Sequence, residues 1–197
     1  MSIPAGGRPR DPRIEEAVLV ATTDLLAEVG PRELTVADVA RAAGCGKAAI
    51  YRRWGTKNDL IVTAVERLYR APEIPDTGAL RGDLLAAARH YSGRDAQSAR
   101  VLANLLLETT RDPELRDAAY RSVGGPPVAV LTGVIRRAIA RGEVAATVPV
   151  DLIVAIVPAI AFRNVVSAGR TLNESDLIEL IDGILMPALT ASGPAPA

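Results

Sequence analysis

Apolar residues recur at intervals of three and four along most of the chain, which is the pattern of amphipathic helices. The first such segment follows Asp11 and Pro12, which are typical of a helix cap and of the first helical position. Gly30 and Pro31 end this segment. The pattern therefore predicts a first helix over about 12–29.

Three shorter helices are expected after the first. The hydroxyl of Thr35 can cap the amide of Asp38 while that carboxylate reaches back, and Thr56 with Asp59 repeats the arrangement. Between these two starts, a compact helix follows Gly46 and closes near residue 55. The sequence thus predicts two short helices joined by a glycine-containing turn, with a longer helix after them.

Two prolines in the segment 71–78 break this fourth helix, and we place a domain boundary there. Glycine, proline or Asp-Pro signals separate the helical patterns that follow. These patterns cover 79–93, 95–110, 113–142, 149–169 and 174–190. Two glycines and two prolines at 124–127 interrupt the third pattern, so it is either one kinked helix or two helices.

The composition agrees with an all-α fold of about nine helices. The chain has 197 residues, of which 49% are hydrophobic and 3% aromatic, so a core of Leu, Val, Ile and Ala is expected. This length suits either one sizeable domain or a small domain attached to a larger one. The boundary at 71–78 favours the second arrangement.

The charges are unevenly distributed, although the formal net charge is zero. Between Val39 and Lys57 every charged residue is basic, and the N-terminal residues 1–10, expected to be a flexible arm, are basic as well. A polyanionic partner for this part of the chain is therefore expected.

Several other classes of protein are disfavoured by the same sequence. Cys45 and His90 are the single cysteine and the single histidine, so neither a disulfide framework nor a zinc site is expected, and no cofactor is predicted. The N-terminus lacks the apolar region of a signal peptide. The apolar run 152–162 is shorter than the ~20 residues of a membrane span and is interpreted as a buried core helix. A cytoplasmic location is expected.

The segment from Leu34 to Trp54 has the layout of a helix-turn-helix, in which the second helix enters the major groove of DNA and the first crosses the backbone. Small residues after Gly46 would let the second helix approach the bases, where Lys47 and Arg52 can donate to base acceptors. Hydroxyl and basic groups beside them can bind phosphates. The predicted DNA-binding residues are Arg10, Thr35, Gly46, Lys47, Ala48, Ala49, Tyr51, Arg52, Arg53 and Lys57.

The string LTVADVARAAGCGKAAIYRRWGTKNDLI resembles the TetR family of bacterial transcriptional regulators. The matching features include Thr35 before the first motif helix, Ile50 with Tyr51 in the second, and Trp54 after it. Cys45 followed by Gly46 departs from the family, where an aliphatic residue and a capping residue such as serine are common. The resemblance implies a helix-turn-helix domain over 11–55, a connecting helix over 56–71, and a ligand-binding and dimerisation domain over 79–190. A disordered tail over 191–197 is expected from its composition.

Candidate residues in the C-terminal domain follow from polarity and apolar pattern. Polar or aromatic side chains that could line a small-molecule pocket are His90, Tyr91, Arg94, Asn104, Glu108 and Tyr120. The last two helices carry more apolar surface than one bundle face needs, and the resemblance implies that they pair two copies of the chain. The interface residues expected there are Ile153, Ile156, Val157, Ile160, Leu177, Ile181, Ile184 and Leu185.

The sequence therefore predicts a homodimeric repressor that binds a palindromic operator and is released by a small effector. One alternative is a helical ligand-binding protein without operator binding. Another is an all-α enzyme, but the sequence has no nucleophile elbow, phosphate-binding glycine loop or metal-ligand cluster, so an enzyme is not predicted. Cys45 is expected to be a small buried thiol in the turn rather than a redox sensor.

Overall fold

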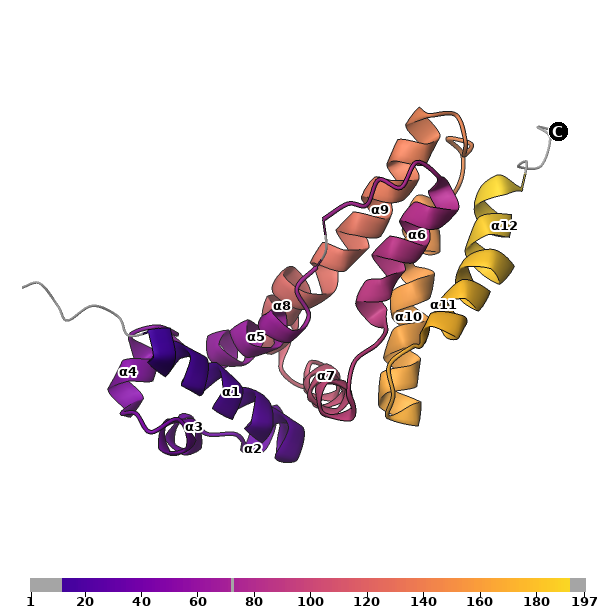
Figure 1. Cartoon of the computed structure of the whole chain (residues 1–197). Coiled ribbons are helices and arrows are strands. Elements are labelled where there is room, and N and C mark those ends of the chain that lie inside the picture. The colour runs from indigo at the N-terminus through magenta and orange to yellow at the C-terminus, as the bar shows by residue number, and fades with distance from the viewer. Residues whose placement is uncertain (1–11, 72, 192–197) are drawn as a thin grey trace, which may run out of the picture.

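The computed structural model describes residues 12–71 and 73–191, and these residues form an all-helical molecule (Figure 1). The N-terminal helices are α1 (Pro12–Glu28), α2 (Gly30–Glu33), α3 (Val36–Ala42), α4 (Lys47–Tyr51) and α5 (Lys57–Leu68). The remaining elements are α6 (Leu80–Ala88), η1 (Arg89–Tyr91), α7 (Ala96–Glu108), α8 (Pro113–Ala119), η2 (Tyr120–Gly124), α9 (Gly125–Ala140), α10 (Val150–Ala168), α11 (Glu174–Leu180), η3 (Ile181–Leu185) and α12 (Met186–Thr190). The all-α prediction is confirmed, and the turn α2 is the element that the sequence pattern did not anticipate. The predicted cap Asp11, the basic arm and most of the predicted tail lie outside the described residues.

Side-chain caps begin the helices at the expected positions. The hydroxyl oxygen of Thr35 accepts a hydrogen bond from the Asp38 amide at 3.2 Å, and Thr56 accepts one from Asp59 at 3.0 Å. Asp59 completes the reciprocal pair by accepting from the Thr56 amide at 3.0 Å. The carboxylate of Asp38 also reaches back to Thr35, as predicted. It accepts a hydrogen bond from the Thr35 hydroxyl at 2.5 Å.

The interrupted pattern at 113–142 is one continuous helix that contains a π-helical turn. Element η2 joins α8 to α9, and the Gly125 amide donates to the carbonyl oxygen of Tyr120 five residues earlier. A side chain at Gly125 would bring its Cβ within 2.9 Å of that same oxygen. Pro126 and Pro127 lack an N–H group and are accommodated in the first turn of α9. The structure thus selects the kinked helix over two separate ones.

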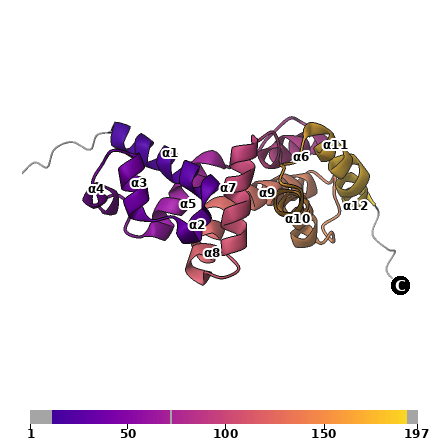
Figure 2. The same ribbon diagram turned by 90° about the horizontal axis from the view of Figure 1, so that it is seen from below.

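Two apolar cores hold the molecule together. The first joins α1, α3, α4 and α5 to residues of α7, α8 and η2, and the second joins α6, α9, α10 and the helix of α11, η3 and α12. Helix α7 lies between α1 on one side and α10 on the other (Figure 2). The N-terminal helices are therefore completed by helices from beyond the predicted boundary at 71–78.

A buried carboxylate ties the segment before α6 to the second core. Asp83 is 0% exposed, and it accepts hydrogen bonds from the Thr77 amide at 2.6 Å, the Thr77 hydroxyl at 2.8 Å and Arg137 at 2.9 Å. Arg137 also donates to the carbonyl oxygen of Pro75. Burial opposes ionisation of Asp83, but the hydrogen bonds from Thr77 and Arg137 hold its pKa below the ordinary value. We call these residues the Asp83 latch.

Helix α10 is long and apolar enough, by length and composition alone, to cross a membrane. In the structure it packs against α7 and α9, and four of its buried residues, Ile153, Val154, Val157 and Ala161, belong to the second core. The interpretation of this run as a buried core helix is therefore correct for one side of α10 only, because Leu152 and Phe162 on the same helix are 72% and 45% exposed.

Candidate DNA-binding surface and C-terminal cavity

Helices α3 and α4 are held as a unit by a tight turn and a shared core. Gly44 adopts a φ of +63°, a conformation that favours glycine, and the Cys45 amide donates to the carbonyl oxygen of Ala40 at 2.9 Å. Val39 and Ile50 meet in the first core beneath the turn, and Cys45 is a half-buried free thiol packed against that core. The helix-turn-helix layout predicted from the sequence is thus present in the structure.

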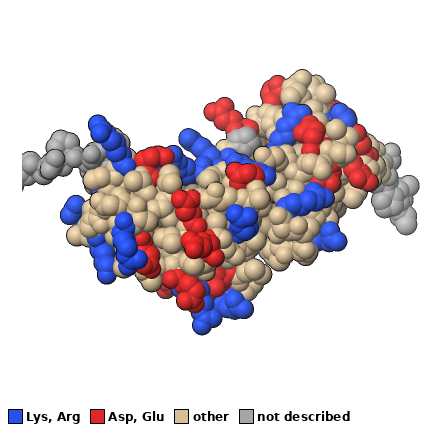
Figure 3. All heavy atoms as spheres, turned by 60° about the horizontal axis from the view of Figure 1, so that its bottom comes forward, with Lys and Arg blue, Asp and Glu red and all other residues tan. Residues whose placement is uncertain are grey.

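One face of α4 is left exposed. Lys47, Ala48, Tyr51 and Arg52 are all exposed, and their spacing along the helix puts them on the same side. Tyr51 is 52% exposed, which is unusual for a large aromatic side chain in a small domain. Gly46 provides no side-chain cap, so the first amides of α4 have no side-chain partner at that position. Figure 3 shows basic side chains at the end of the molecule that carries α3 and α4.

Arg53 and Lys57, which were predicted to bind phosphates, are less exposed than that role suggests. The side chain of Arg53 is 10% exposed, donates to the carbonyl oxygen of Ala49 at 3.2 Å and lies 3.8 Å from a carboxylate oxygen of Glu15. Lys57 is half-buried, and its ammonium donates to the carbonyl oxygens of Pro31 at 2.9 Å and of Leu34 at 3.3 Å. Both cations therefore fasten α4 and α5 to the neighbouring elements.

The other predicted DNA-binding residues differ in exposure. Thr35 is exposed at the start of α3, and Ala49 is half-buried behind the exposed face of α4. Arg10 lies outside the described residues. The structure thus brings Thr35 and the exposed face of α4 to one end of the molecule.

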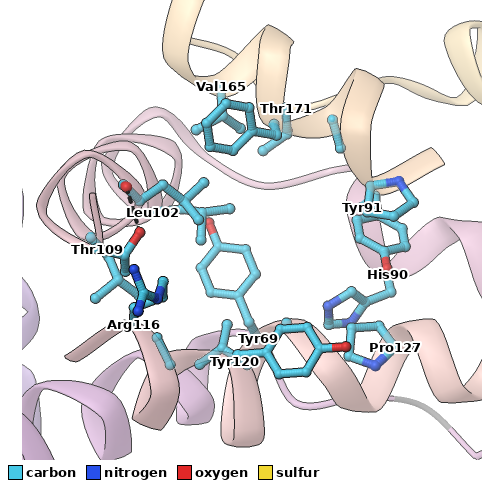
Figure 4. Close-up of a pocket in the computed structure, with 18 residues that line it drawn as sticks. Tyr69, His90, Tyr91, Leu102, Thr109, Arg116, Tyr120, Pro127, Val165 and Thr171 are labelled. Carbon is cyan, nitrogen blue, oxygen red and sulfur yellow. Dashed lines mark hydrogen bonds between the residues drawn. The ribbon is translucent and has the colours of Figure 1, made fainter. Parts of the chain in front are cut away.

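A cavity of about 260 Å³ lies between the two cores (Figure 4). Eighteen residues line it, from Tyr69 at the end of α5 to Thr171 in the segment after α10. They are Tyr69, His90, Tyr91, Leu102, Leu105, Leu106, Thr109, Arg116, Ala119, Tyr120, Val123, Gly124, Pro127, Pro158, Ala161, Phe162, Val165 and Thr171. Most of these side chains are apolar or aromatic, which is typical of sites for small molecules.

Three of the six residues predicted to line a pocket lie in the wall of this cavity. They are His90, Tyr91 and Tyr120. The residues that sequence reasoning missed are mostly apolar, since Leu and Val at helical spacing give the same signal whether they face a cavity or a filled core.

The other three predicted lining residues serve the packing of the helices. The guanidinium of Arg94 lies 4.9 Å from the ring centre of Tyr69, and Arg94 is not among the residues that line the cavity. Asn104 donates to the carbonyl oxygen of Leu26 at 2.8 Å, and so joins α7 to α1. Glu108, the last residue of α7, lies 3.9 Å from Arg111 in the turn that follows the helix. Polarity alone therefore did not distinguish residues that line the cavity from residues whose side chains make contacts elsewhere.

Burial keeps the inner wall of the cavity uncharged near neutral pH. Burial, with the charge of Arg94, lowers the pKa of His90 to about 4, although a hydrogen bond with the backbone of Arg70 opposes this. Burial also raises the pKa values of Tyr69 and Tyr91. Tyr69 donates its hydroxyl proton to the carbonyl oxygen of Ser98 at 2.6 Å. Tyr69, His90 and Tyr91 are therefore neutral at pH 7.

Five of the eight residues predicted to form a dimer interface are inside the monomer. Ile153, Val157, Leu177, Ile181 and Leu185 are each at most 4% exposed and belong to the second core. They are not available to a partner, because the helical period marks an apolar stripe without saying what covers it.

The remaining three candidates are less deeply buried. Ile156 and Ile160 are half-buried against the second core, whereas Ile184 is 45% exposed. Two large apolar side chains of α10 are also exposed, Leu152 at 72% and Phe162 at 45%. The exposed apolar face of α10 thus lies beside the stripe that the sequence suggested.

Comparisons with protein families match both parts of the chain. Residues 18–64 match the model described as "Bacterial regulatory proteins, tetR family", and residues 74–184 match the model described as "Tetracyclin repressor-like, C-terminal domain". The second match covers more than half of the chain by itself. The helix-turn-helix and the helical region after it are thus recognised separately.

Two solved structures share the fold. A TetR-family transcriptional regulator from Rhodococcus sp. has a TM-score of 0.71 at 20% identity and covers 91% of this chain and 100% of its own. The regulator FadR from Bacillus subtilis, solved in complex with stearoyl-CoA, has a TM-score of 0.63 at 18% identity and covers 90% and 99%.

Relatives of known sequence extend over nearly the whole chain. An uncharacterized HTH-type transcriptional regulator of Mycobacterium tuberculosis is 31% identical over 191 residues, which is 96% of this chain and 94% of the relative. The DNA-binding transcriptional repressor TetR of Mycobacteroides abscessus is 29% identical over 174 residues, which is 86% and 90%. This chain therefore belongs to the TetR family of bacterial transcriptional regulators, which bind DNA through a helix-turn-helix and are not enzymes.

Proposed function

We propose that this protein is a homodimeric repressor that binds a palindromic operator in the cytoplasm and leaves it when a small effector occupies the C-terminal cavity. The observation that carries the proposal is the exposed face of α4, where Lys47 and Arg52 flank small and aromatic side chains. A protein that only bound a ligand would have no use for such a basic recognition face, which favours operator binding over that alternative.

At the DNA, small side chains let α4 lie deep in the major groove. Lys47 donates to the O6 and N7 acceptors of guanine, with Arg52 at the edge of the same contact. Thr35 and the hydroxyl of Tyr51 bind phosphates on either side of the groove. Arg53 and Lys57 act mainly by holding α4 and α5 in place, through the contact of Arg53 with Glu15 of α1 and the hydrogen bond of Lys57 to Pro31 of α2.

Two copies are needed, because a helix-turn-helix that reads a palindrome requires a two-fold partner. The exposed apolar side chains on α10 and on the final helix, such as Leu152, Phe162, Ile178 and Ile184, support an interface there. This interface replaces the buried stripe that the sequence suggested.

The effector site and the DNA-binding helices are close enough to influence each other. Arg116, Ala119 and Tyr120 line the cavity from α8 and η2, which pack against α5. At the start of α8, Asp112 accepts a hydrogen bond from Asn58 of α5 at 3.1 Å. A ligand that fits the non-binding arrangement better would shift the equilibrium away from DNA. Similarity to FadR, solved with stearoyl-CoA, and to the repressor of Mycobacteroides abscessus supports this assignment.

The first test is a titration of the purified protein with DNA from upstream of its own gene, followed by fluorescence anisotropy at several salt concentrations. We expect sequence-selective binding that weakens steeply as salt increases. Binding that is equal for a scrambled sequence would refute the operator assignment.

The second test measures the oligomeric state by analytical ultracentrifugation. Phe162→Glu places a charge on the exposed face of α10, and we expect this variant to sediment as a monomer. Val20→Glu is the matched control, because Val20 is an apolar residue of α1 with a similar exposure of 48%. A dimer that survives Phe162→Glu together with Leu152→Glu places the interface elsewhere.

A further inference from the structure

We propose that the cavity takes a mainly apolar molecule with a single negative charge, with its apolar body at the buried end and its anionic group beside Arg116. The inference rests on the proposed function, in which this cavity is the effector site, and it adds the chemical class of the effector. It is argued from the residues that form the two ends of the cavity.

The buried end offers apolar contacts and uncharged groups. His90 is 9% exposed, and its low pKa keeps the imidazole neutral at pH 7. Tyr91 lies beside it, with the two rings 5.1 Å apart in an edge-to-face arrangement. Figure 4 shows these residues and Pro127 on the side of the cavity opposite Thr109 and Arg116. A charged group at the buried end would lose its hydration without gaining an ionic partner among the residues that line the cavity.

The opposite end is open to solvent and cationic. The side chain of Arg116 is 57% exposed, so solvent reaches its guanidinium. The carboxylate of Asp117 lies 3.6 Å from Arg116, but both side chains are exposed, and such pairs contribute little. The guanidinium thus remains able to bind a carboxylate or phosphate of a ligand.

The charged residues in and near the wall favour one sign of charge on the ligand. Arg116 is the single charged residue among the eighteen that line the cavity, and none of the eighteen is Asp or Glu. Arg94 stands just outside the wall and adds positive potential at Tyr69 and His90. A cation would therefore be repelled, whereas an anion has one partner at the rim.

The volume limits the apolar part. At about 260 Å³ the cavity is slightly below the range of roughly 300–1,000 Å³ that is usual for small-molecule sites. A short alkyl chain or a single ring system fits this space better than a large polycyclic molecule. Octanoate is therefore a suitable probe.

The experiment is calorimetric titration of the full-length, DNA-free protein at pH 7.5 with octanoate, 1-octanol and octylamine. These probes share one chain and differ in the charge of the end group. We expect octanoate to bind roughly five- to tenfold more tightly than octanol, the preference given by one charge-assisted contact at a solvent-exposed rim. Octylamine should bind more weakly than octanol.

Arg116→Gln identifies the residue that causes this preference. In that variant the affinities for octanoate and octanol should become equal, while the affinity for octanol itself stays unchanged. Arg121→Gln is the matched control, because Arg121 is an exposed arginine of η2 that does not line the cavity. It should keep the preference for the anion.

Three results would overturn the inference: no binding of octanoate, equal binding of the three probes, or a preference that Arg116→Gln leaves intact. The operator titration of the ligand-free protein is a separate measurement. A protein that binds operator but not octanoate refutes the ligand class alone. A protein that binds octanoate with the expected selectivity but no operator refutes the proposed function alone.

Discussion

The proposed DNA-binding face and the cavity are built in opposite ways. The face consists of exposed side chains from the five-residue helix α4 together with Thr35, all within a short stretch of sequence. The cavity is lined by residues from Tyr69 to Thr171, which come from helices far apart in the chain. Local structure defines the first site, and packing between helices defines the second.

This difference has an energetic consequence. Exposed side chains on α4 contribute little to folding, so changes there should affect DNA affinity and leave stability intact. Polar groups buried in the C-terminal region hold helices together, so changes there should first affect stability. The four predictions below test this contrast.

The largest effect is expected at the Asp83 latch. Asp83→Ala leaves Thr77 and Arg137 without their shared acceptor, and we expect the free energy of unfolding to fall by about 3–5 kcal/mol. Urea denaturation measures it. Asp182→Ala is the control, because Asp182 forms a 2.6 Å ion pair with Arg81 on the surface, and its loss should cost less than about 1 kcal/mol. Equal losses in the two variants would show that the latch has no special role.

The next effect is a dependence of stability on pH. His90 is the single histidine, with a pKa of about 4 in the folded chain against about 6.5 when unfolded. Between these values the unfolded chain binds more protons, so stability is complete above pH 6.5 and falls as the pH drops toward 4. The loss reaches about 3 kcal/mol. Denaturation of His90→Gln should show a flatter profile in this window, and a parallel profile would contradict the prediction.

Lys47→Ala tests the exposed face. Loss of a base contact should weaken operator binding roughly ten- to hundredfold and relax the preference for guanine at one position of each half-site. The midpoint of urea denaturation should not move. Arg136→Ala, which removes an exposed arginine of α9, is the control and should leave both quantities unchanged. A marked loss of stability in Lys47→Ala would break the contrast between the two regions.

The smallest effects concern helix caps beside the DNA-binding face. Thr56→Ala removes a reciprocal cap and should lower the free energy of unfolding by about 1 kcal/mol. Gly46→Ser should raise it by a few tenths of a kcal/mol, because Gly46 has an ordinary φ of −83° and open space around it. Thermal denaturation compares the two variants. A decrease in Gly46→Ser would mean that the cap position needs glycine.

The helix-turn-helix could be predicted well because its signals are local. Caps at Thr35 and Thr56 and the glycine turn are each visible within a few residues, and the structure has helices that begin there. For Arg53 and Lys57 the sequence suggested phosphate binding but not their contacts with α1 and α2. Glu15, which lies beside Arg53, and Pro31, which accepts from Lys57, belong to other elements and stand 38 and 26 residues earlier, so no local pattern reveals them.

Sites that depend on several helices were predicted only in part. The sequence pointed to His90, Tyr91 and Tyr120, which line the cavity, but also to Arg94, Asn104 and Glu108, which do not. It also assigned to a partner surface five apolar residues that the second core covers. Periodicity gives the direction of a side chain relative to its own helix, and the identity of the neighbouring helix comes from packing.

The sequence by itself determined the all-α class, the positions of the helix starts, and the family to which the DNA-binding motif belongs. These follow from local hydrogen bonding and from a compact motif. The tertiary structure decided that α7 and α8 complete the first core, that the interruption at 124–127 is a π-helical kink, and which residues enclose the cavity. Burial depends on every helix at once, and for that reason it could not be read from any single segment of the chain.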